Sequence, residues 1–392
     1  MTVYADNAAT TRCGKAALNA MLPFFHKEFG NPSSLHSYGQ KASAALQTAR
    51  ESVARSLGAS PQEIYFTGSG SESDNQAIRS AALTGAKKNK RHLITSAIEH
   101  HAVLHTLNQL KREGFEVTIL PVDKDGLVTP EQVADAIRMD SALVTIMTAN
   151  NEVGTIEPVA EIAKVCKEKG VIFHTDAVQA AGHIPLDIKT LGADMLSLSG
   201  HKLHGPKGVG VLWCRKGVPL LSLINGGGQE RMRRAGTENI PGIVGLAVAL
   251  EEAVAELNEV GARLTVLRDK LIAGLSQIER SRLNGHPTKR LPGNVNFCFE
   301  GIEGESLLLL LDQKGVCASS GSACTSGSLD PSHVLLALGL PHEIAHGSLR
   351  LSFSRETTEA EIDHILSVAP PVVNYLRSIS PVWESIQATR RS

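Results

Sequence analysis

Lys202 follows a short apolar run in the stretch DMLSLSGHKLHGPKGVG, residues 194–210. The alternation of apolar and polar residues predicts a half-buried strand that ends at Gly200 and presents the lysine in the next turn. Ligands bind at the carboxyl ends of strands in an open α/β sheet, so a lysine there, beside Ser197 and Ser199, is a candidate Schiff-base former. Most lysines are solvated surface charges, and position alone leaves that alternative open.

A second group of polar residues lies upstream, in VIFHTDAVQAAG. The apolar run 171–173 predicts a buried strand, and Thr175, Asp176 and Gln179 follow where it ends. An acid there can keep a pyridinium nitrogen protonated, and a lysine paired with such an acid is what pyridoxal phosphate requires of a protein. Alone, Asp176 is more typical of a helix cap or a loop acid, but its pairing with Lys202 favours the cofactor role.

Glycines and serines separate a predicted strand from a predicted helix in EIYFTGSGSESDNQAIRSAAL, residues 63–83. The turn at residues 68–71 would present backbone N–H groups, hydroxyls and the positive end of a helix dipole to a phosphate. No Gly-Lys-Ser/Thr follows, so the turn is not a Walker loop, and it lacks the third glycine of a dinucleotide fingerprint. A Gly/Ser turn by itself is more often a plain loop.

Together these motifs resemble those of the cysteine desulfurases, most closely the NifS type. The resemblance runs from YADNAATT near the N-terminus to SPVW near the C-terminus, without a large insertion. Its motifs are SGHKLHGPKGVG with Lys202, HTDAVQ with Asp176 and Gln179, IEHHAV with His100, ANNEVGT with Asn151, and SSGSACTSGSLDPSHV with Cys324. The family usually has threonine at Ser71 and often serine at Gly68. The hydroxyl of Ser71 should preserve a phosphate contact.

The resemblance implies fold type I of the pyridoxal-phosphate enzymes, an α/β fold with a large and a small domain. Independently, strand-like stretches alternate with helical patterns, which argues for a mainly parallel sheet with helices on both faces. The seven stretches are EIYFT, RHLITS, FEVTIL, ALVTIMT, VIFHT, DMLSLS and VGVLW. We expect a large cofactor-binding domain over residues 15–258 and a small α+β domain formed by residues 1–14 with 259–392.

The resemblance also assigns roles to single residues. The cofactor would be pyridoxal 5′-phosphate, attached to Lys202, protonated at its ring nitrogen by Asp176 and covered by His100, which can act as acid or base. The remaining cofactor-binding positions correspond to Gly70, Ser71, Asn151, Gln179, Ser199, His201 and Thr237.

Substrate binding and assembly follow from the same resemblance. The planar guanidinium of Arg350, together with Asn151, would bind the carboxylate of L-cysteine. The loop NGGGQERMRRAGTE, residues 225–238, could otherwise be a mobile surface loop. In the family it crosses a homodimer interface, so Thr237 would contact the cofactor phosphate of the other subunit.

Cys324 lies among glycines, serines and threonines, where no apolar core can bury it. The resemblance implies that its thiolate takes the sulfur of L-cysteine as a persulfide, leaving L-alanine, and that a flexible loop delivers the sulfur. The acceptor would be an iron–sulfur scaffold protein of the NifU or IscU type, in general or nitrogenase-linked cluster assembly, and Cys324 could transiently ligate a shared 2Fe–2S cluster. Cys166 and Cys298 are expected to be small apolar residues of the core, and Cys317 is expected to be buried.

Three other functions compete with this interpretation. A pyridoxal-phosphate aminotransferase or lyase shares the cofactor residues but has no need of Cys324 on a flexible loop. A selenocysteine lyase shares nearly every residue, and only a comparison of substrates separates the two. A noncatalytic sulfur carrier or scaffold keeps Cys324 but has no use for Lys202.

Composition narrows the classes of partner. The chain has 392 residues, 42% of them hydrophobic, which suits a soluble globule with a sizeable core. Its 39 basic and 40 acidic residues leave no basic excess of the kind that favours nucleic acid or an anionic membrane. The sequence shows neither a membrane-spanning apolar run nor a signal-peptide pattern, so we expect a cytoplasmic protein.

The stretch His342–His346, HEIAH, matches the zinc-protease signature HExxH. The context disfavours a metal, because Gly347 follows at once, SLRLSF then alternates like a strand, and no third ligand follows at the expected spacing. We expect no intrinsic metal site.

Overall fold

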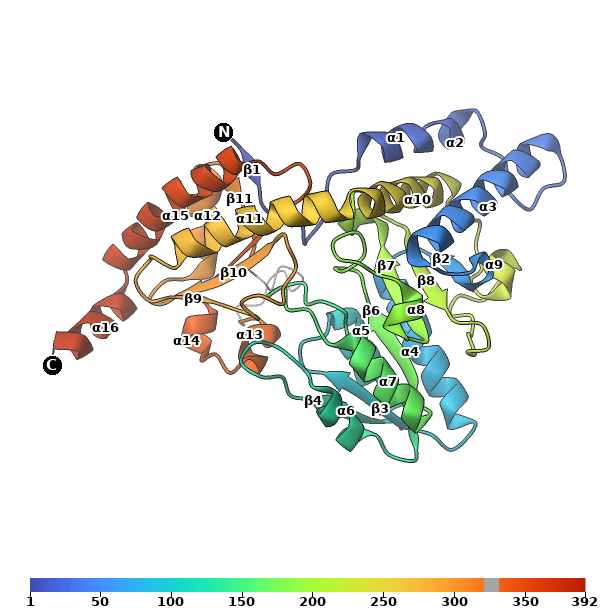
Figure 1. Cartoon of the computed structure of the whole chain (residues 1–392), viewed down its shortest axis with the longest axis horizontal. Helices are drawn as coiled ribbons and strands as arrows, with labels where there is room; N and C mark the ends of the chain where they lie inside the picture. The colour runs from blue at the N-terminus through green and yellow to red at the C-terminus, as the bar shows by residue number, and fades with distance from the viewer. Residues whose placement is uncertain (321–330, 392) are drawn as a thin grey trace.

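The computed structural model describes residues 1–320 and 331–391, so Cys324 and its loop lie outside the described residues. Figure 1 shows a large sheet beside a smaller one, with the consecutive helices α10 (Ile240–Ala255) and α11 (Leu257–Leu275) extending from one to the other. Both chain termini lie on the side of the smaller sheet.

Seven strands form the large sheet, in the order β2-β8-β7-β6-β5-β3-β4. They are β2 (Ile64–Thr67), β3 (His92–Ser96), β4 (Glu116–Leu120), β5 (Ser141–Thr145), β6 (Ile172–Asp176), β7 (Met195–Ser199) and β8 (Gly210–Cys214). β8 runs antiparallel to both neighbours, β2 and β7, and the other pairs are parallel. All seven predicted strands are present, and the predicted α/β class is confirmed.

Helices cover both faces of this sheet, because its strands are buried on both sides. The helices of one face are α4 (Gly70–Ala86) and α5 (His101–Arg112), and those of the other are α3 (Ser37–Leu57), α7 (Val159–Lys169) and α10. Side chains alternate between the faces along each strand. Phe173 therefore packs in the α3, α7 and α10 core, while His174 and Asp176 point to the α4 side.

The smaller region is built on a three-stranded antiparallel sheet, in the order β12-β10-β9. Its strands are β9 (Ser281–Leu283), β10 (Asn294–Phe299) and β12 (Ser348–Ser352), and its core is completed by α11, α12 (Gly304–Gln313) and α15 (Glu359–Ser378). The N-terminal arm joins it, because β1 (Val3–Tyr4) pairs with β11 (Val316–Cys317) and Val3 lies in its core.

The remaining elements are short or peripheral. They are α1 (Lys15–Met21), α2 (Pro23–His26), α6 (Pro130–Ala136), α8 (Ile188–Leu191), α9 (Gln229–Met232), α13 (His333–Ala337), α14 (His342–Ala345), α16 (Pro381–Arg391), and the 3-10 turns η1 (Pro61–Glu63) and η2 (Gly200–Lys202). The HExxH stretch thus begins in a four-residue helix, α14, and His346 is its C-cap.

The predicted burial of Cys317 is wrong. The residue is only half-buried, whereas its neighbour Val316 is fully buried. The reason is the side-chain alternation of β11, a strand of two residues in which one points into the core and the next points away. Cys166 and Cys298 are buried, as predicted.

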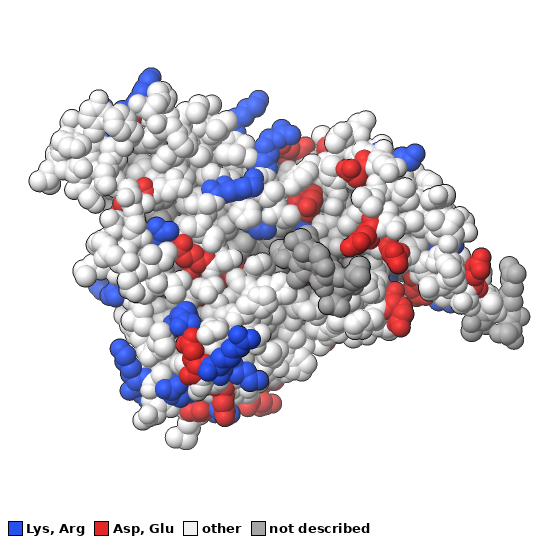
Figure 2. Space-filling model, turned by 180° about the vertical axis from the view of Figure 1, so that it is seen from behind, with Lys and Arg blue, Asp and Glu red and all other residues white. Residues whose placement is uncertain are grey.

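Charge is spread over the molecule without a dominant sign. On the face shown in Figure 2, basic and acidic side chains intermix. No helix within the described residues is long and apolar enough to cross a membrane.

A buried ion pair fixes the loop that contains α9. Glu230, Arg231 and Met232 all have positive φ, of 45°, 56° and 63°, which is unfavourable for residues with side chains. The Glu230 carboxylate accepts hydrogen bonds from the Arg50 guanidinium at 2.6 and 2.8 Å and from the Phe66 backbone N–H at 2.9 Å. These contacts tie the loop to α3 and β2 and offset its backbone strain.

Glu230→Ala should therefore destabilise the protein by about 3 kcal/mol or more, because it leaves the Arg50 charge buried and unpaired. Chemical denaturation measures this change. The control is Glu116→Ala, which removes an exposed partner of Arg138 and should hardly shift the midpoint. Equal effects of the two substitutions would contradict the role given to the buried pair.

Candidate active site

Lys202 and Asp176 lie at neighbouring strand ends. Asp176 is the last residue of β6 and pairs with Ser197 of β7, and Lys202 ends the 3-10 turn that follows β7. The Nζ of Lys202 donates hydrogen bonds to the carbonyl oxygens of Ala8 at 2.5 Å and Ala9 at 2.9 Å. The N-terminal arm therefore passes directly over the strand ends and holds the lysine there.

The Asp176 carboxyl is buried, with 5% of its surface exposed. Burial raises its pKa to about 6, although a hydrogen bond from the Val178 N–H at 2.8 Å and the nearby Lys202 charge act in the opposite direction. A cation beside this carboxyl would favour its ionised form. The side chain of Gln179 donates to the Ala8 carbonyl at 3.0 Å, next to Lys202.

The helix α4 begins at Gly70, in the turn where the sequence predicts an anion cradle. Ser69 caps the helix by accepting from the Glu72 N–H at 3.1 Å. Within the described residues, the N–H groups of Gly70 and Ser71 have no hydrogen-bond partner. A Cβ at Gly70 would lie 2.7 Å from Val178 and 3.3 Å from Ser199, so only glycine allows this approach to β7.

His100 is the N-cap residue of α5. Its Nδ1 accepts from the Ala102 N–H at 3.1 Å, so the neutral ring carries its proton on Nε2. Burial and the Lys202 charge lower the pKa of His100 to about 4. With Ser71 it lines a cavity of about 500 Å³ that adjoins the α4 N-terminus.

Arg350 lies on β12, with 3% of its surface exposed. Its guanidinium donates to Asp6 Oδ1 at 2.9 Å and to the backbone carbonyl of Asn151 at 3.1 Å. Its Nε has no partner within the described residues. Arg350 therefore retains N–H donors, that of Nε among them, for a further anion.

The other predicted residues divide into two groups. Ser199 is buried at the end of β7, and His201 Nδ1 is 3.2 Å from the Thr10 hydroxyl of the arm, so both lie beside Lys202. Thr237 is exposed in the loop after α9, and no hydrogen bond within the described residues links it to the strand ends. Cys324 lies outside the described residues.

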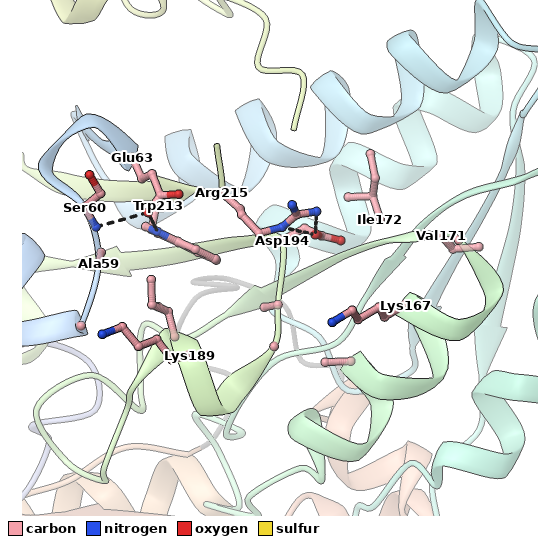
Figure 3. Close-up of a pocket in the computed structure, with 16 residues that line it drawn as sticks. Ala59, Ser60, Glu63, Lys167, Val171, Ile172, Lys189, Asp194, Trp213 and Arg215 are labelled. Atoms are coloured by element: carbon pink, nitrogen blue, oxygen red, sulfur yellow. Dashed lines mark hydrogen bonds and ion pairs between the residues drawn. The ribbon is translucent and has the colours of Figure 1, made fainter. Parts of the chain in front are cut away.

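A separate cavity of about 850 Å³ lies at the opposite end of the sheet, where β6 and β7 begin (Figure 3). Three of its charged residues have partners in the structure: Arg215 pairs with Asp194 at 2.5 Å, and Glu63 accepts from the Trp213 indole at 3.3 Å. None of the predicted site residues lines this cavity.

Sequence reasoning missed a buried polar cluster beneath Asp176. Asp74, Glu99 and His174 are all less than 2% exposed. A signal for Asp74 was present, because it precedes Ala77 and Ile78 by three and four residues on the apolar face of α4. A charged residue in that stripe is unusual and marks either a pairing or a function.

Comparison with known proteins identifies the class. The aminotransferase class-V model matches residues 3–365. A NifS-like protein superposes with a TM-score of 0.90 at 42% identity, covering 96% of this chain and 100% of that one. A structure of SspA in complex with cysteine gives a TM-score of 0.81 at 39% identity, covering 91% and 100%. The fold is thus fold type I of the pyridoxal-phosphate enzymes, in its aminotransferase class-V form.

The particular family follows from the curated relatives. The cysteine desulfurase IscS of Methanosarcina thermophila is 57% identical over 380 residues, which are 97% of this chain and 94% of the relative. The chain belongs to the cysteine desulfurase family of the class-V aminotransferases, and the resemblance seen in its motifs is confirmed.

The pKa of His100 gives a first prediction at this site. Because its folded pKa lies below the unfolded value of about 6.5, the unfolded state binds the proton more readily, and the contribution to stability is lost as pH falls from about 6.5 to 4. Replacing His100→Gln removes this dependence. Urea unfolding at pH 7.5 and 5 should show wild type losing more stability than the variant, by up to about 1 kcal/mol per pH unit.

Parallel losses in wild type and His100→Gln would contradict the assignment of a depressed pKa to His100.

Proposed function

We propose that this chain is a cysteine desulfurase, which takes sulfur from L-cysteine as a persulfide on Cys324 and releases L-alanine. The observation that carries the proposal is the convergence of Asp176, Lys202 and the α4 N-terminus at one edge of the large sheet. The family membership supports it, as does the relative named a cysteine desulfurase.

The described residues fit pyridoxal phosphate as the cofactor. The two unpartnered N–H groups at the start of α4 suit its phosphate, helped by the helix dipole. The buried Asp176 carboxyl suits its ring nitrogen. The Lys202 amine, in the turn after the neighbouring strand β7, suits its aldehyde carbon.

Pyridoxal phosphate supplies an electron sink for the carbon that bears the substrate amino group. Lys202 would hold the cofactor and, once its amine is released, remove the proton from the substrate Cα. Asp176 would keep the ring nitrogen protonated, and Gln179 and Ser199 would line the site beside it. The neutral His100 ring would cover the cofactor, with its Nε2–H available as a proton donor.

Arg350 and Asn151 would orient the substrate. The Nε of Arg350 is available as a donor while its terminal nitrogens bind Asp6 and the Asn151 carbonyl. A carboxylate bound there leaves the substrate amine free to face Lys202. Fixing the substrate in this way lowers the barrier, because much of the entropy is already lost when the substrate binds.

Cys324 would perform the sulfur transfer. Its thiolate attacks the substrate sulfur, forming an S–S bond while the Cβ–S bond breaks. The electron pair of the broken bond stays on Cβ, which takes a proton and becomes the methyl group of alanine. The step needs no added oxidant, since the sulfur is oxidised as the carbon is reduced.

The assembly belongs to the proposal. We propose a homodimer in which Thr237 of one subunit completes the phosphate site of the other, and a sulfur acceptor of the iron–sulfur scaffold type, NifU or IscU. The cytoplasm is the proposed location, because the reaction requires a reduced thiol. A nitrogenase-linked role and a general role in cluster assembly both remain compatible with the residues.

The proposal also covers the division of the chain into domains. We propose that residues 15–258 and residues 1–14 with 259–392 act as two domains. Three of the cores support this division, since one gathers Val3 and the C-terminal helices and two others cover the faces of the large sheet. A smaller cluster, with Met147 and Cys298, joins the two parts.

Lys202→Ala should abolish the cofactor absorbance band above 400 nm and lower alanine formation by about 1,000-fold or more, because both the attachment and the base are lost. The control is Lys207→Ala, since Lys207 is exposed in the next turn. Spectroscopy and an alanine assay measure both. Activity retained in Lys202→Ala and lost in Lys207→Ala would refute the assignment.

Cys324→Ser should still bind pyridoxal phosphate but release no alanine, because a serine hydroxyl is not ionised near neutral pH and is a poor nucleophile toward sulfur. Cys317→Ser is the matched control and should keep most of its activity. Burial, Asp312 and Asp6 raise the pKa of Cys317 and keep it a thiol.

Mass spectrometry after a pulse of L-cysteine should find the added sulfur on the peptide with Cys324. Sulfur found on Cys317 instead would overturn the mechanism.

A further inference from the structure

Asp74 is a buried acid for which the proposed mechanism has no use. It lies one turn inside α4, the helix whose N-terminus forms the phosphate cradle, and 1% of its surface is exposed. Its Oδ1 has no hydrogen-bond partner within the described residues. The helix packs on β5, β6, β7 and β8, so Asp74 faces the sheet beneath the site.

The polar groups around Asp74 are linked to one another by short contacts. His174 Nε2 is 3.7 Å from Asp74 Oδ1 and 3.0 Å from the Ser197 hydroxyl, and His174 Nδ1 is 2.9 Å from the Thr145 hydroxyl. His174 precedes Asp176 by two residues on β6, so both project to the α4 side. Burial lowers the pKa of His174 to about 3, so the ring is neutral and provides no charge to pair with Asp74.

The charges that act on Asp74 are negative. Burial and repulsion from Asp176 and Glu99 raise its pKa well above the usual value, and the Ser197 hydroxyl only partly opposes them. The Lys202 charge acts on Asp176, and Asp176 also accepts a backbone N–H. Of two neighbouring acids in one buried site, the one without a cation retains the proton.

We propose that Asp74 is a positioning residue that works as a neutral carboxylic acid: it packs the first turns of α4 against β6 and leaves Asp176 as the carboxylate for the cofactor ring. The helix thereby sets the distance between its phosphate-binding N-terminus and Asp176. The statement that Asp74 positions the cofactor site rests on the proposed function. The statement that Asp74 is a neutral acid does not.

The first arm of the test uses the cofactor-free protein. A carboxyl whose folded pKa lies above its unfolded value of about 4 loses stability as pH rises from that value toward the folded pKa. Asp74→Asn removes this loss. Between pH 5.5 and 8 the melting temperature of the variant should therefore rise relative to that of wild type, by about 1–2 °C per pH unit. Asp176, Glu99 and His174 titrate in both proteins.

A difference in melting temperature that does not change with pH would overturn the neutral-acid assignment. Glu157→Gln is the positive control for the melting experiment, because Glu157 is also a buried acid with a raised pKa. Glu157 is not among the groups that act on Asp176. It should show a similar gain with pH.

The second arm measures the dissociation constant of pyridoxal phosphate. Asp74→Asn should bind it within about twofold of wild type, because the amide preserves shape and neutrality, whereas Asp74→Ala should bind it about tenfold more weakly, because the contact with β6 is lost. Glu157→Gln should bind it normally. The pH at which the absorbance band of the bound cofactor changes should be the same in Asp74→Asn and wild type.

Each outcome of the second arm is decisive. A shift of that pH by about one unit in Asp74→Asn would mean that Asp74 is charged and would overturn the proposal. Normal binding by Asp74→Ala would overturn the positioning role. Failure of wild type itself to bind the cofactor would refute the proposed function and leave the first arm standing.

Discussion

The parallel pairing of β6 with β7 is the constraint on which the rest of the site depends. Its register sets Asp176 opposite Ser197, so both strands end at the same edge of the sheet. The turn after β7 then closes tightly, because the Gly205 N–H donates to the Gly200 carbonyl at 2.9 Å and a Cβ at Gly200 would lie 3.0 Å from the Pro206 carbonyl. A one-residue slip of β6 would reverse its two faces and remove Asp176 from the α4 side.

The N-terminal arm links this edge to the smaller sheet. Asp6 binds Arg350 of β12, and the next residues, Ala8 and Ala9, accept hydrogen bonds from Lys202. The arm is itself anchored by β1, which pairs with β11. The proposed reaction needs two cations, Lys202 for the cofactor and Arg350 for the substrate carboxylate. One short segment, residues 6–9 of the arm, thus binds both, although Lys202 follows a strand of the large sheet and Arg350 lies on a strand of the smaller one.

The sequence pattern within short stretches predicted those features of the structure that depend on neighbouring residues. The seven strands and the Gly70 turn follow from periodicity and turn chemistry within about ten residues. The carbonyl partners of Lys202 and the pairing of Asp6 with Arg350 could not be predicted in this way, since they join residues more than 190 positions apart. The break at Glu256 between α10 and α11 is likewise not marked by any proline or glycine at that position.

The buried acids under the site also bear on stability. An ionised carboxylate in an apolar interior is costly, and burial raises the pKa of Asp74, Asp176 and Glu99 for this reason. A protonated pyridine ring beside Asp176 would add a cation to that of Lys202 and reduce the cost of ionising Asp176 further. Cofactor binding and folding would then be coupled through one charge, and the holoprotein would owe part of its stability to the same electrostatic arrangement that makes Asp176 useful in the reaction.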